Sequence, residues 1–577
     1  MNEPFTSRQE MQRDATNHAA LAATREIFAG TPRFTDPAIA AVAARDGVAA
    51  AWREAYRRHG DHAAEYAVGD FAIALVTPDG GHYLAVDRFA VRTLCYRVVD
   101  GTLHAAERAD ELADAATDID PQAIFNYLFF HVIPSPRTIY ADIFRLPPGH
   151  RARFANGKLD VAPYWIARFD EIRAPDFPAL RDTFRQCIRE AVKEQIGARP
   201  PEAVACFLSG GTDSSTVAGM AGEVLGQPAA TYSIGFDAEG YDEMEYARIA
   251  VRHFKTRHHE YYITPDDLLR SIPEVAGSYD QPFGNSSALP TYYCARIAQA
   301  DGVGKMLAGD GGDELFGGNA RYVKQRVFDW YGLLPGVLRG ALLEPIFARP
   351  AMVRLPLVRK GASYVEQARV PMPDRLNMYN LLLRLGIDDV LTKDFLARVD
   401  IETPAREQRE AWALADTHHL INRTLAFDWR YTLAENDLPK VCGTTRLAGV
   451  EVGFPLLDQR LLDFSLKLPA DYKLKGLRLR WFFKEALRGF LPDEILVKKK
   501  HGFGLPFGIW ATRHAGLKRL AEDSLHALSG RGIVRPEFIR TLLAERLQEY
   551  PGYYGEMVWI LMMLEQWLQQ HAPDYKV

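Results

Sequence analysis

The 577-residue chain carries 69 Lys and Arg against 74 Asp and Glu, which gives a net charge of −5. This balance offers no general electrostatic case for nucleic-acid binding, and the length predicts two or three domains. Its five cysteines never form a Cys-x-x-Cys pair, which argues against a disulfide framework or zinc cluster and fits a reducing compartment: Cys95, Cys187, Cys206, Cys294 and Cys442.

The sequence shows neither a targeting signal nor a membrane segment. Its N-terminal stretch, MNEPFTSRQEMQRD, is polar and lacks the apolar core of a secretory signal. Apolar runs such as WILMMLEQWL, residues 559–568, are too short to cross a bilayer and carry charge. We therefore expect a soluble, cytoplasmic protein with neither nucleic-acid nor membrane partners.

The first third of the sequence has the pattern of a β-rich domain. After a helical pattern at residues 37–58, short β-rich runs from Tyr66 onward alternate with Pro-Asp-Gly-Gly and Asp-Gly turns, which predicts a meander of hairpins. This pattern breaks at Arg173-Ala174-Pro175. We therefore predict a first domain over residues 1–172 and a second over residues 178–577.

The second domain begins with strands and helices in alternation. Buried-strand patterns are separated by helical patterns and occur at residues 203–209, 229–236, 258–263 and 304–310. This rhythm predicts an α/β domain, in which a parallel sheet carries helices on both faces. Beyond about residue 320 the pattern is mostly helical.

A Gly- and Ser-rich loop, SGGTDSS at residues 209–215, follows the first of these strands. Gly210 and Gly211 let the backbone turn tightly and approach an anion. The next helix offers its positive N-terminus, and Ser209, Ser214 and Ser215 add hydroxyl donors. These features predict a phosphate or pyrophosphate site, although neither GxxxxGKS/T nor GxGxxG is present. The alternative is a turn that only caps a helix.

Several motifs carry a resemblance to one family. Ser-Gly-Gly-x-Asp-Ser-Ser resembles the pyrophosphate loop of enzymes that cleave ATP between the α and β phosphates. From about residue 60 to about residue 515, further motifs resemble the asparagine synthetase family in order and spacing: TRHHEYY (256–262), Asp280-Gln281-Pro282, Asn285-Ser286-Ser287, AGDGGDELFGGNARY (308–322), GFPLLDQRLLDFSLKLP (453–469) and KKKHGFGLPFGIW (498–510). The resemblance implies a degenerate, β-rich Ntn-amidotransferase-like domain. It also implies a following adenine-nucleotide α-hydrolase-like synthetase domain, with a parallel sheet and a helical C-terminal part.

The resemblance implies ATP and Mg²⁺ as cofactors. In this family ATP adenylates a substrate carboxylate, and an amine then displaces AMP to give an amide. A carboxylate that attacks a polyanion needs positioned cations. By similarity, Asp213 and Asp313 would hold Mg²⁺ on the phosphates, and Lys500 would contact phosphate in the transition state. The alternatives are a helix N-terminal acid for Asp213 and a surface basic run for Lys498-Lys499-Lys500.

The resemblance also implies a nucleotide pocket and a base. Leu208, Ile234 and Gly309 match family positions that line the adenosine pocket, and ordinary strand-end core is the alternative. Asp310 matches a position that is acidic in family members and tyrosine in β-lactam synthetases, so it is the candidate base for the amine. We give His258-His259-Glu260 structural weight only, because adjacent strand residues point to opposite faces.

The residues that glutamine hydrolysis needs are missing from the first domain. Glutamine-dependent family members begin Met-Cys-Gly, and that cysteine is the nucleophile, activated by its own α-amine. Here the sequence begins Met1-Asn2-Glu3, and its first cysteine is Cys95. GDFAIAL (69–75), AVDRFAVRTLCYR (85–97) and IFRLPPGH (143–150) still resemble the core of the amidotransferase domain. We therefore expect a chain that makes no ammonia from glutamine.

The amine must then come from a substrate or from free ammonia. Family members without this cysteine resemble β-lactam synthetases, carbapenam synthetases and lasso-peptide cyclases, which close a peptide N-terminal amine onto an Asp or Glu side chain. Three features favour the cyclase: the chain length, Asp310 in place of tyrosine, and Cys442-Gly443-Thr444-Thr445 where asparagine synthetases carry Asp-Arg-x-Ser-Met. A precursor peptide, a leader peptidase and a leader-recognition protein would be its partners.

Three alternatives stay open. The first is an asparagine synthetase-like enzyme that uses ammonia or a partner glutaminase, and the second is a β-lactam synthetase-like cyclase. The third is an inactive scaffold or binding protein. Intact Ser209–Ser215, Asp313 and Lys500 argue against the scaffold, since a dead site should lose its charged groups.

Overall fold

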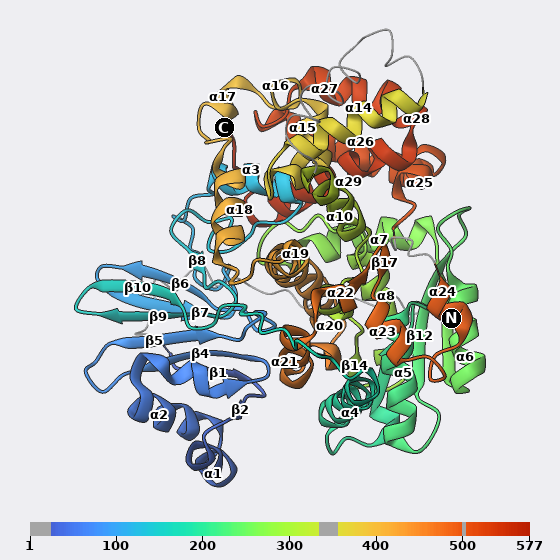
Figure 1. Cartoon of the computed structure of the whole chain (residues 1–577). Helices are drawn as coiled ribbons and strands as arrows, with labels where there is room; N and C mark the ends of the chain where they lie inside the picture. Colours follow the sequence, from blue (N-terminus) through green and yellow to red (C-terminus); the bar gives the residue numbers. More distant parts are fainter. Residues whose placement is uncertain (1–24, 334–355, 499–503) are drawn as a thin grey trace, which may run out of the picture.

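Two sheets organise the chain (Figure 1). The structure is a computed structural model and describes residues 25–333, 356–498 and 504–577. The first sheet is antiparallel, in the order β1 (Ile27–Gly30), β4 (Phe71–Val76), β5 (His82–Val86), β9 (His150–Ala155) and β10 (Lys158–Pro163). A smaller antiparallel sheet packs against it through Tyr96 and Leu103, in the order β7 (Thr102–Ala106), β6 (Cys95–Val99) and β8 (Phe144–Arg145).

Local sequence explains how this first sheet forms. Asn156 and Gly157 both have positive φ, which suits the tight two-residue turn between β9 and β10. The two alanine-rich helices α1 (Pro37–Asp46) and α2 (Val48–His59) cover one face of the sheet. Trp52 of α2 is fully buried there, with its ring 5.0 Å from that of Phe71. The expected β-rich first domain is confirmed.

The second sheet is parallel throughout. Its order is β13 (Arg257–Ile263), β12 (Ala230–Phe236), β11 (Val204–Phe207), β14 (Lys305–Leu307) and β15 (Glu451–Gly453). After β13 the chain returns to the other side of β11, so the direction of strand addition reverses there. Ligands of open α/β sheets bind at such a reversal, beyond the carboxyl ends of the strands.

Helix α4 (Phe177–Ile196) precedes the first of these strands, and the expected alternation of strands and helices is confirmed. The helices between β11 and β14 are α5 (Thr212–Leu225), α6 (Met244–Phe254), α7 (Pro265–Ser278) and α8 (Ala288–Ala300). All four predicted strands are present. The fifth, β15, was not expected, because it has three residues and follows a long helical region.

The remaining described residues are mainly helical. The longest helix among them, α29 (Pro551–His571), buries Trp559 and Trp567 in the largest hydrophobic core. Tyr127 of α3 (Pro121–Phe130) donates its hydroxyl to Ile560 O of α29 at 2.9 Å, which ties the first third of the chain to its C-terminal end. Within the described residues, no helix has the length and apolar character needed to cross a bilayer.

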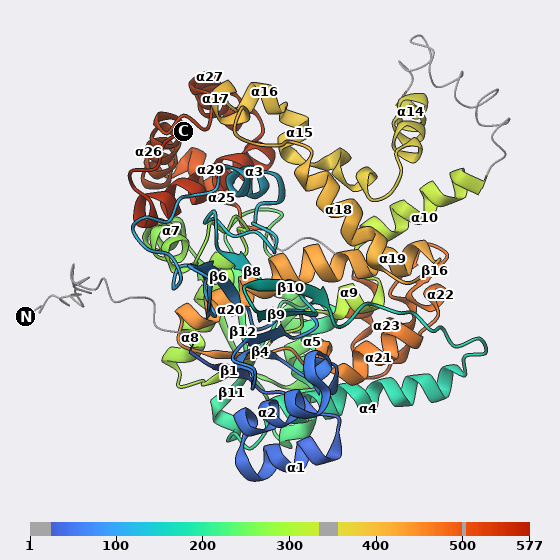
Figure 2. The same ribbon diagram turned by 90° about the vertical axis from the view of Figure 1, so that its left-hand side faces the viewer.

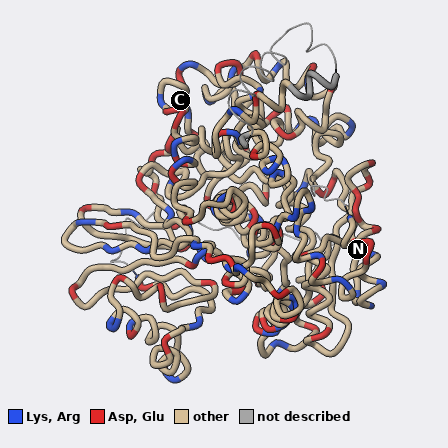
Figure 3. Tube along the Cα trace, in the orientation of Figure 1, with Lys and Arg blue, Asp and Glu red and all other residues tan. Residues whose placement is uncertain are grey.

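Two further views complete the arrangement. Figure 2 shows α10 (Ala320–Leu333) and α14 (Pro356–Arg369) projecting to one side of the C-terminal helices. Lys and Arg are interspersed with Asp and Glu along the trace in both halves (Figure 3). The boundary proposed at residues 172–178 begins in the connection from β10 to α4 and ends in the first turn of α4, and those domain limits stay a prediction.

Candidate active site

The Gly- and Ser-rich loop joins β11 to α5 at the carboxyl end of the parallel sheet. Gly210 has φ +69°, and a Cβ there would lie 2.3 Å from backbone atoms of Tyr246 and Ala247, so only glycine fits. Ser209 N donates to Ser214 Oγ at 3.2 Å, and the hydroxyls of Ser209 and Ser214 are 3.1 Å apart. Helix α5 begins after Gly211 without a side-chain cap. The helix-capping alternative therefore loses support, and the first-turn N–H groups suit an anion.

Ser215 lies differently from the other loop serines. Its side chain is fully buried, and its hydroxyl has no hydrogen-bond partner among the described residues. Neither Ser215 nor Gly210 lines a cavity beside the loop, whereas Ser209 and Ser214 line two. Gly210 shapes the turn, and Ser215 lies behind the surface that a ligand would touch.

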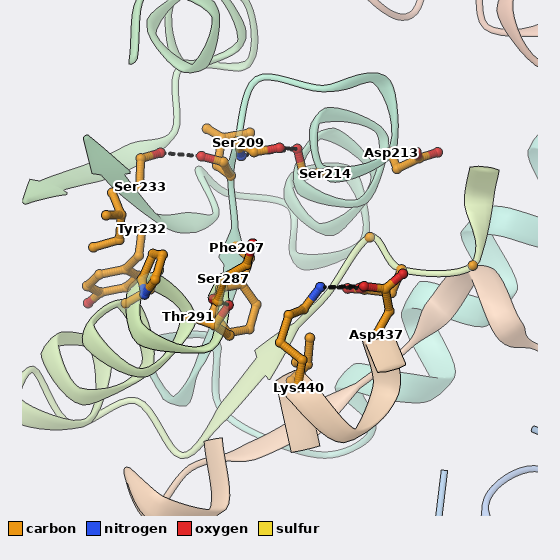
Figure 4. A pocket seen from close by; sticks show the side chains of 18 of the residues that line it. Phe207, Ser209, Asp213, Ser214, Tyr232, Ser233, Ser287, Thr291, Asp437 and Lys440 are labelled. Carbon is orange, nitrogen blue, oxygen red and sulfur yellow. Dashed lines mark hydrogen bonds and ion pairs between the residues drawn. The ribbon is translucent and has the colours of Figure 1, made fainter. Parts of the chain in front are cut away.

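A cavity of about 440 Å³ opens between the ends of β11, β12 and β14 (Figure 4). Leu208, Ile234 and Gly309 all line it, as do Tyr232 and, from α8, Thr291. A Cβ on Gly309 would lie 2.7 Å from Ser214 N, so this glycine allows the strand end to approach α5. The three residues expected to line an adenosine pocket therefore share one cavity.

The opposite wall of this cavity carries three charged side chains. Lys440 Nζ lies 2.9 Å from Asp437 Oδ1 and 3.6 Å from Asp310 Oδ1. Burial raises the pKa of Asp310, and Lys440 opposes that rise. Burial by itself would lower the pKa of Lys440, but the two carboxylates raise it above its ordinary value. The Asp310 carboxylate therefore takes up a proton more readily than usual, and the Lys440 ammonium lies beside it.

Sequence reasoning missed Asp437 and Lys440. They stand three residues apart, where the π-helical segment η5 (Trp429–Asp437) gives way to α20 (Leu438–Leu447). Segments of π-helix occur often at functional sites, because the wider turn re-aims side chains. The signal was the pair of opposite charges in ENDLPKV (435–441), directly before Cys442.

Asp213 and Asp313, the expected metal pair, meet at a guanidinium. Arg480 Nη1 donates to Asp213 Oδ2 and to Asp313 Oδ1, both at 2.7 Å, and Nη2 pairs with Asp213 Oδ1. All three side chains are largely buried, with 18%, 17% and 5% exposed for Asp213, Asp313 and Arg480. The structure therefore brings the predicted pair together around an arginine that the sequence did not single out.

These carboxylates also fit a magnesium ion. Asp213 Oδ2 and Asp313 Oδ1 both lie 2.7 Å from Arg480 Nη1, so one oxygen of each carboxylate already faces a single positively charged group. No group of three or more His, Cys, Asp and Glu able to hold a metal occurs within the described ranges. Two carboxylates are what Mg²⁺ uses when substrate phosphates and water complete its shell.

Two glycines make room for this ion cluster. A Cβ on Gly312 would lie 2.0 Å from Asp213 Oδ1, and a Cβ on Gly318 would lie 1.6 Å from Asp313 Oδ1. Both glycines belong to the GDGGDELFGG motif, and α9 (Gly312–Phe316) carries Asp313 between them. The motif therefore supplies both a carboxylate and the space around it.

A second cavity, of about 890 Å³, lies on the other side of the same loop. It shares Ser209, Asp213, Ser214 and Asp313 with the first cavity and adds cationic side chains that include Arg480 and Lys484. The shared residues place the carboxylate pair at the junction of the two cavities.

Lys500 lies outside the described residues, so its predicted role stays a prediction. Its neighbour Lys498 is not part of an exposed basic run. Lys498 is 7% exposed, its Nζ is 3.1 Å from Glu243 Oε2, and it lies 4.2 Å from the ring centre of Tyr246. Of these three lysines, only Lys498 lies within the described residues, and it pairs with Glu243.

Several named proteins are similar in sequence to most of this chain. Glutamine-hydrolysing asparagine synthetase 1 of Bacillus subtilis is 25% identical over 460 residues, covering 79% of this chain and 70% of that protein. Amidase chyE of Penicillium rubens is 23% identical over 512 residues, with 81% and 74% covered. Amidase chry2 of Gibberella zeae is 25% identical over 504 residues, with 79% and 72% covered.

Family profiles cover both parts of the chain. The profile described as a glutamine amidotransferase domain matches residues 52–165, and the profile described as asparagine synthase matches residues 183–569. The second match spans the parallel sheet, the Ser209–Ser215 loop and both carboxylates of the Arg480 cluster. The chain therefore belongs to the asparagine synthase family of ATP-dependent, amide-forming ligases.

Proposed function

We propose that this chain adenylates a substrate carboxylate with ATP and couples it to an amine that its own amidotransferase-like half does not produce. The substrate class that we favour is a peptide whose N-terminal amine closes on an Asp or Glu side chain, as in lasso-peptide macrolactams. Such a peptide would arrive with a leader-recognition protein and a leader peptidase as partners.

In the first step a carboxylate oxygen attacks the α-phosphorus of ATP, the α–β bridging bond breaks, and pyrophosphate leaves. Leu208, Ile234 and Gly309 would hold the adenosine, and the Ser209–Ser215 loop would cradle the outgoing pyrophosphate. Asp213 and Asp313 would hold Mg²⁺, which neutralises charge on the phosphates. Lys500 would add a second positive charge.

In the second step the amine nitrogen attacks the acyl carbon of the adenylate, and AMP leaves. The ammonium formed on the nitrogen must lose a proton. Asp310 is the candidate acceptor, because burial raises its pKa and so makes its carboxylate a stronger base. Lys440 and Asp437 would hold that carboxylate in place.

The cysteine thiols indicate the source of the amine, and this observation carries the proposal. All five cysteines lie within the described residues, and burial is the main cause that raises the pKa of each. The pKa of Cys95, the one cysteine in the amidotransferase-like match, is raised to about 12. A thiol must ionise to attack glutamine, so these cysteines are poor candidates for a glutaminase nucleophile.

Two observations support a large substrate. The two cavities meet at the carboxylate pair, so the site has room on both sides of the phosphate loop. Cys442 and Thr445 of α20 line a third cavity that also touches Arg92 and Arg145 of the amidotransferase-like half. The similarity to the Bacillus asparagine synthetase favours a second candidate, an ammonia-dependent aspartate amidation.

Pyrophosphate release from ATP tests the proposal, with three sets of substrates. The first is aspartate with ammonia, the second is aspartate with glutamine, and the third is a panel of peptides with an internal Asp or Glu. We expect release with a peptide, together with a product lighter by one water. Turnover with aspartate and ammonia would overturn the cyclase, and turnover with glutamine would overturn the proposed amine source.

A further inference from the structure

Arg480 occupies the position between Asp213 and Asp313 that a divalent cation would need. We propose that Arg480 is a resident counter-ion, which excludes Mg²⁺ from the nucleotide-free enzyme and leaves the carboxylates only when the phosphates of ATP attract its guanidinium. This inference rests on the proposed function, because that function makes the two carboxylates the magnesium ligands.

The contacts of the guanidinium show why the two cations compete. Nη1 donates to one oxygen of each carboxylate at 2.7 Å and to Thr212 Oγ1 at 2.8 Å, while Nη2 takes the remaining oxygen of Asp213. The oxygens that would bind a metal are therefore the ones that the arginine uses. Mg²⁺ cannot enter until Nη1 has moved away.

Two features indicate that Arg480 is held ready to move rather than fixed as core. Its Nε–H is buried and has no partner among the described residues, which costs free energy that a phosphate oxygen in the adjoining cavity would restore. Its backbone adopts the left-handed conformation, with φ +54°, where a residue with a Cβ is strained. Strain of this kind concentrates at ligand sites and switches.

The charges around the carboxylates favour replacement of Arg480 by Mg²⁺ only when nucleotide is bound. Lys484, one helical turn after Arg480 on α23 (Trp481–Ala486), lines the same cavity, and its amine makes no hydrogen bond or ion pair to a described residue. Burial and the charge of Arg480 lower the pKa of Lys484. Without nucleotide, Arg480 and Lys484 would repel an added Mg²⁺ ion. The triphosphate of ATP would bring enough negative charge to hold Arg480, Lys484 and Mg²⁺ together.

The test measures Mn²⁺ binding to the full-length protein without nucleotide. Bound Mn²⁺ is determined from the decrease in the electron paramagnetic resonance signal of the free ion. We expect weak binding by the wild type and at least about tenfold tighter binding by Arg480→Met, because the mutation removes the guanidinium that occupies these carboxylate oxygens, together with its positive charge. Arg480→Lys, which cannot bridge both acids with a planar fork, should lie between them. Adding Asp313→Asn to Arg480→Met should abolish the gain.

Arg478→Met is the matched control, because it removes the same charge from the same cavity. Within the described part of the chain, Arg478 is exposed in β17 (Arg478–Leu479) and makes no hydrogen bond or ion pair to Asp213 or Asp313, so its replacement should raise Mn²⁺ affinity much less than Arg480→Met does. Circular dichroism checks that each variant is folded. If Arg480→Met does not fold, the Mn²⁺ titration of the wild type still tests the inference. Tight Mn²⁺ binding by the nucleotide-free wild type would overturn the inference, and so would equally weak binding by a folded Arg480→Met.

Pyrophosphate release separates the inference from the proposed function. If the wild type releases pyrophosphate from ATP but Arg480→Met gains no Mn²⁺ affinity, only the counter-ion role fails. If Arg480→Met gains affinity but no substrate supports pyrophosphate release, the counter-ion role holds and the proposed function fails.

Discussion

The two sheets of this protein hold their buried carboxylates in different ways. In the antiparallel half, the Asp87 carboxylate accepts backbone N–H groups of Phe71, Phe89, Val91 and Arg92 at 3.0–3.2 Å. In the parallel half, Asp213 and Asp313 share one long side chain, that of Arg480. An acid that the backbone holds cannot change partners without unfolding its loop, whereas an acid that a side chain holds can.

The difference separates a structural acid from one available to a ligand, although both are buried. The amidotransferase-like half keeps its sheet and helices, and the buried Asp87 carboxylate fixes a loop there. In the synthetase half, the carboxylates lie at the junction of two cavities. The predictions below test this contrast, beginning with the largest expected effect.

Removing one charge from the carboxylate pair should slow the reaction strongly and leave the protein folded. We expect Asp213→Asn and Asp313→Asn each to lower the rate of pyrophosphate formation by about 10²–10³-fold, because less charge would be stabilised on the phosphates. Pyrophosphate release measures the effect, and far-ultraviolet circular dichroism measures the fold. A folded Asp213→Asn protein with wild-type turnover would show that this pair is no metal site.

Filling the space around the pair should have the next largest effect. In Gly318→Ala the new Cβ would lie 1.6 Å from Asp313 Oδ1 and 2.8 Å from Arg480 Cδ, so both side chains must shift. We expect turnover to fall about tenfold or more and the free energy of unfolding to fall by about 1–3 kcal/mol. Turnover and denaturant unfolding are the measurements.

Gly530→Ala is the control for that substitution. Gly530 ends α26 (Ala515–Gly530), and a Cβ there meets no heavy atom within 4 Å. The replacement should leave turnover unchanged and the free energy of unfolding the same or slightly higher. If Gly318→Ala and Gly530→Ala lost turnover and stability equally, the space around Asp313 would not explain the effect of Gly318→Ala.

The charge of Lys440 should set the pH dependence of amide formation. Burial raises the pKa of Asp310 and Lys440 lowers it, so Lys440→Met should raise that pKa further. A base must be deprotonated, so activity falls as pH decreases through its pKa, and this acid limb should move to higher pH in the variant. We expect turnover at neutral pH to fall about 10- to 100-fold. An unmoved acid limb in the pH–rate profile would exclude Asp310 as the base.

Sequence reasoning found what local patterns encode. The strand–loop–helix at residues 203–225 was expected, since the glycines, serines and helix start are contiguous. Family resemblance paired Asp213 with Asp313, a hundred residues later, and the structure brings both to Arg480. The small β15 strand was missed because it follows a long helical region, whereas the equally short β14 lies in the alternating strand–helix region.

What escaped prediction depends on contacts between distant segments. Arg480 stands in GLRLRW, which has no recognisable pattern of catalytic chemistry, and it reaches Asp213 across 267 positions of sequence. Ser215 looked equivalent to Ser214, but one residue of helical rotation turns its hydroxyl into the core. Long-range placement and side-chain direction were therefore the missing information.

The smallest effect on catalysis should come from Asp87, and it completes the contrast. Asp87→Asn would turn an amide NH₂ toward two of the four backbone N–H groups, so hydrogen bonds would be lost in a loop that the antiparallel sheet needs. We expect the free energy of unfolding to fall by about 1–3 kcal/mol. Turnover per folded molecule should stay unchanged, in contrast to Asp213→Asn. If Asp87→Asn instead lost turnover at full stability, the antiparallel half would take part in the reaction and would be more than a scaffold.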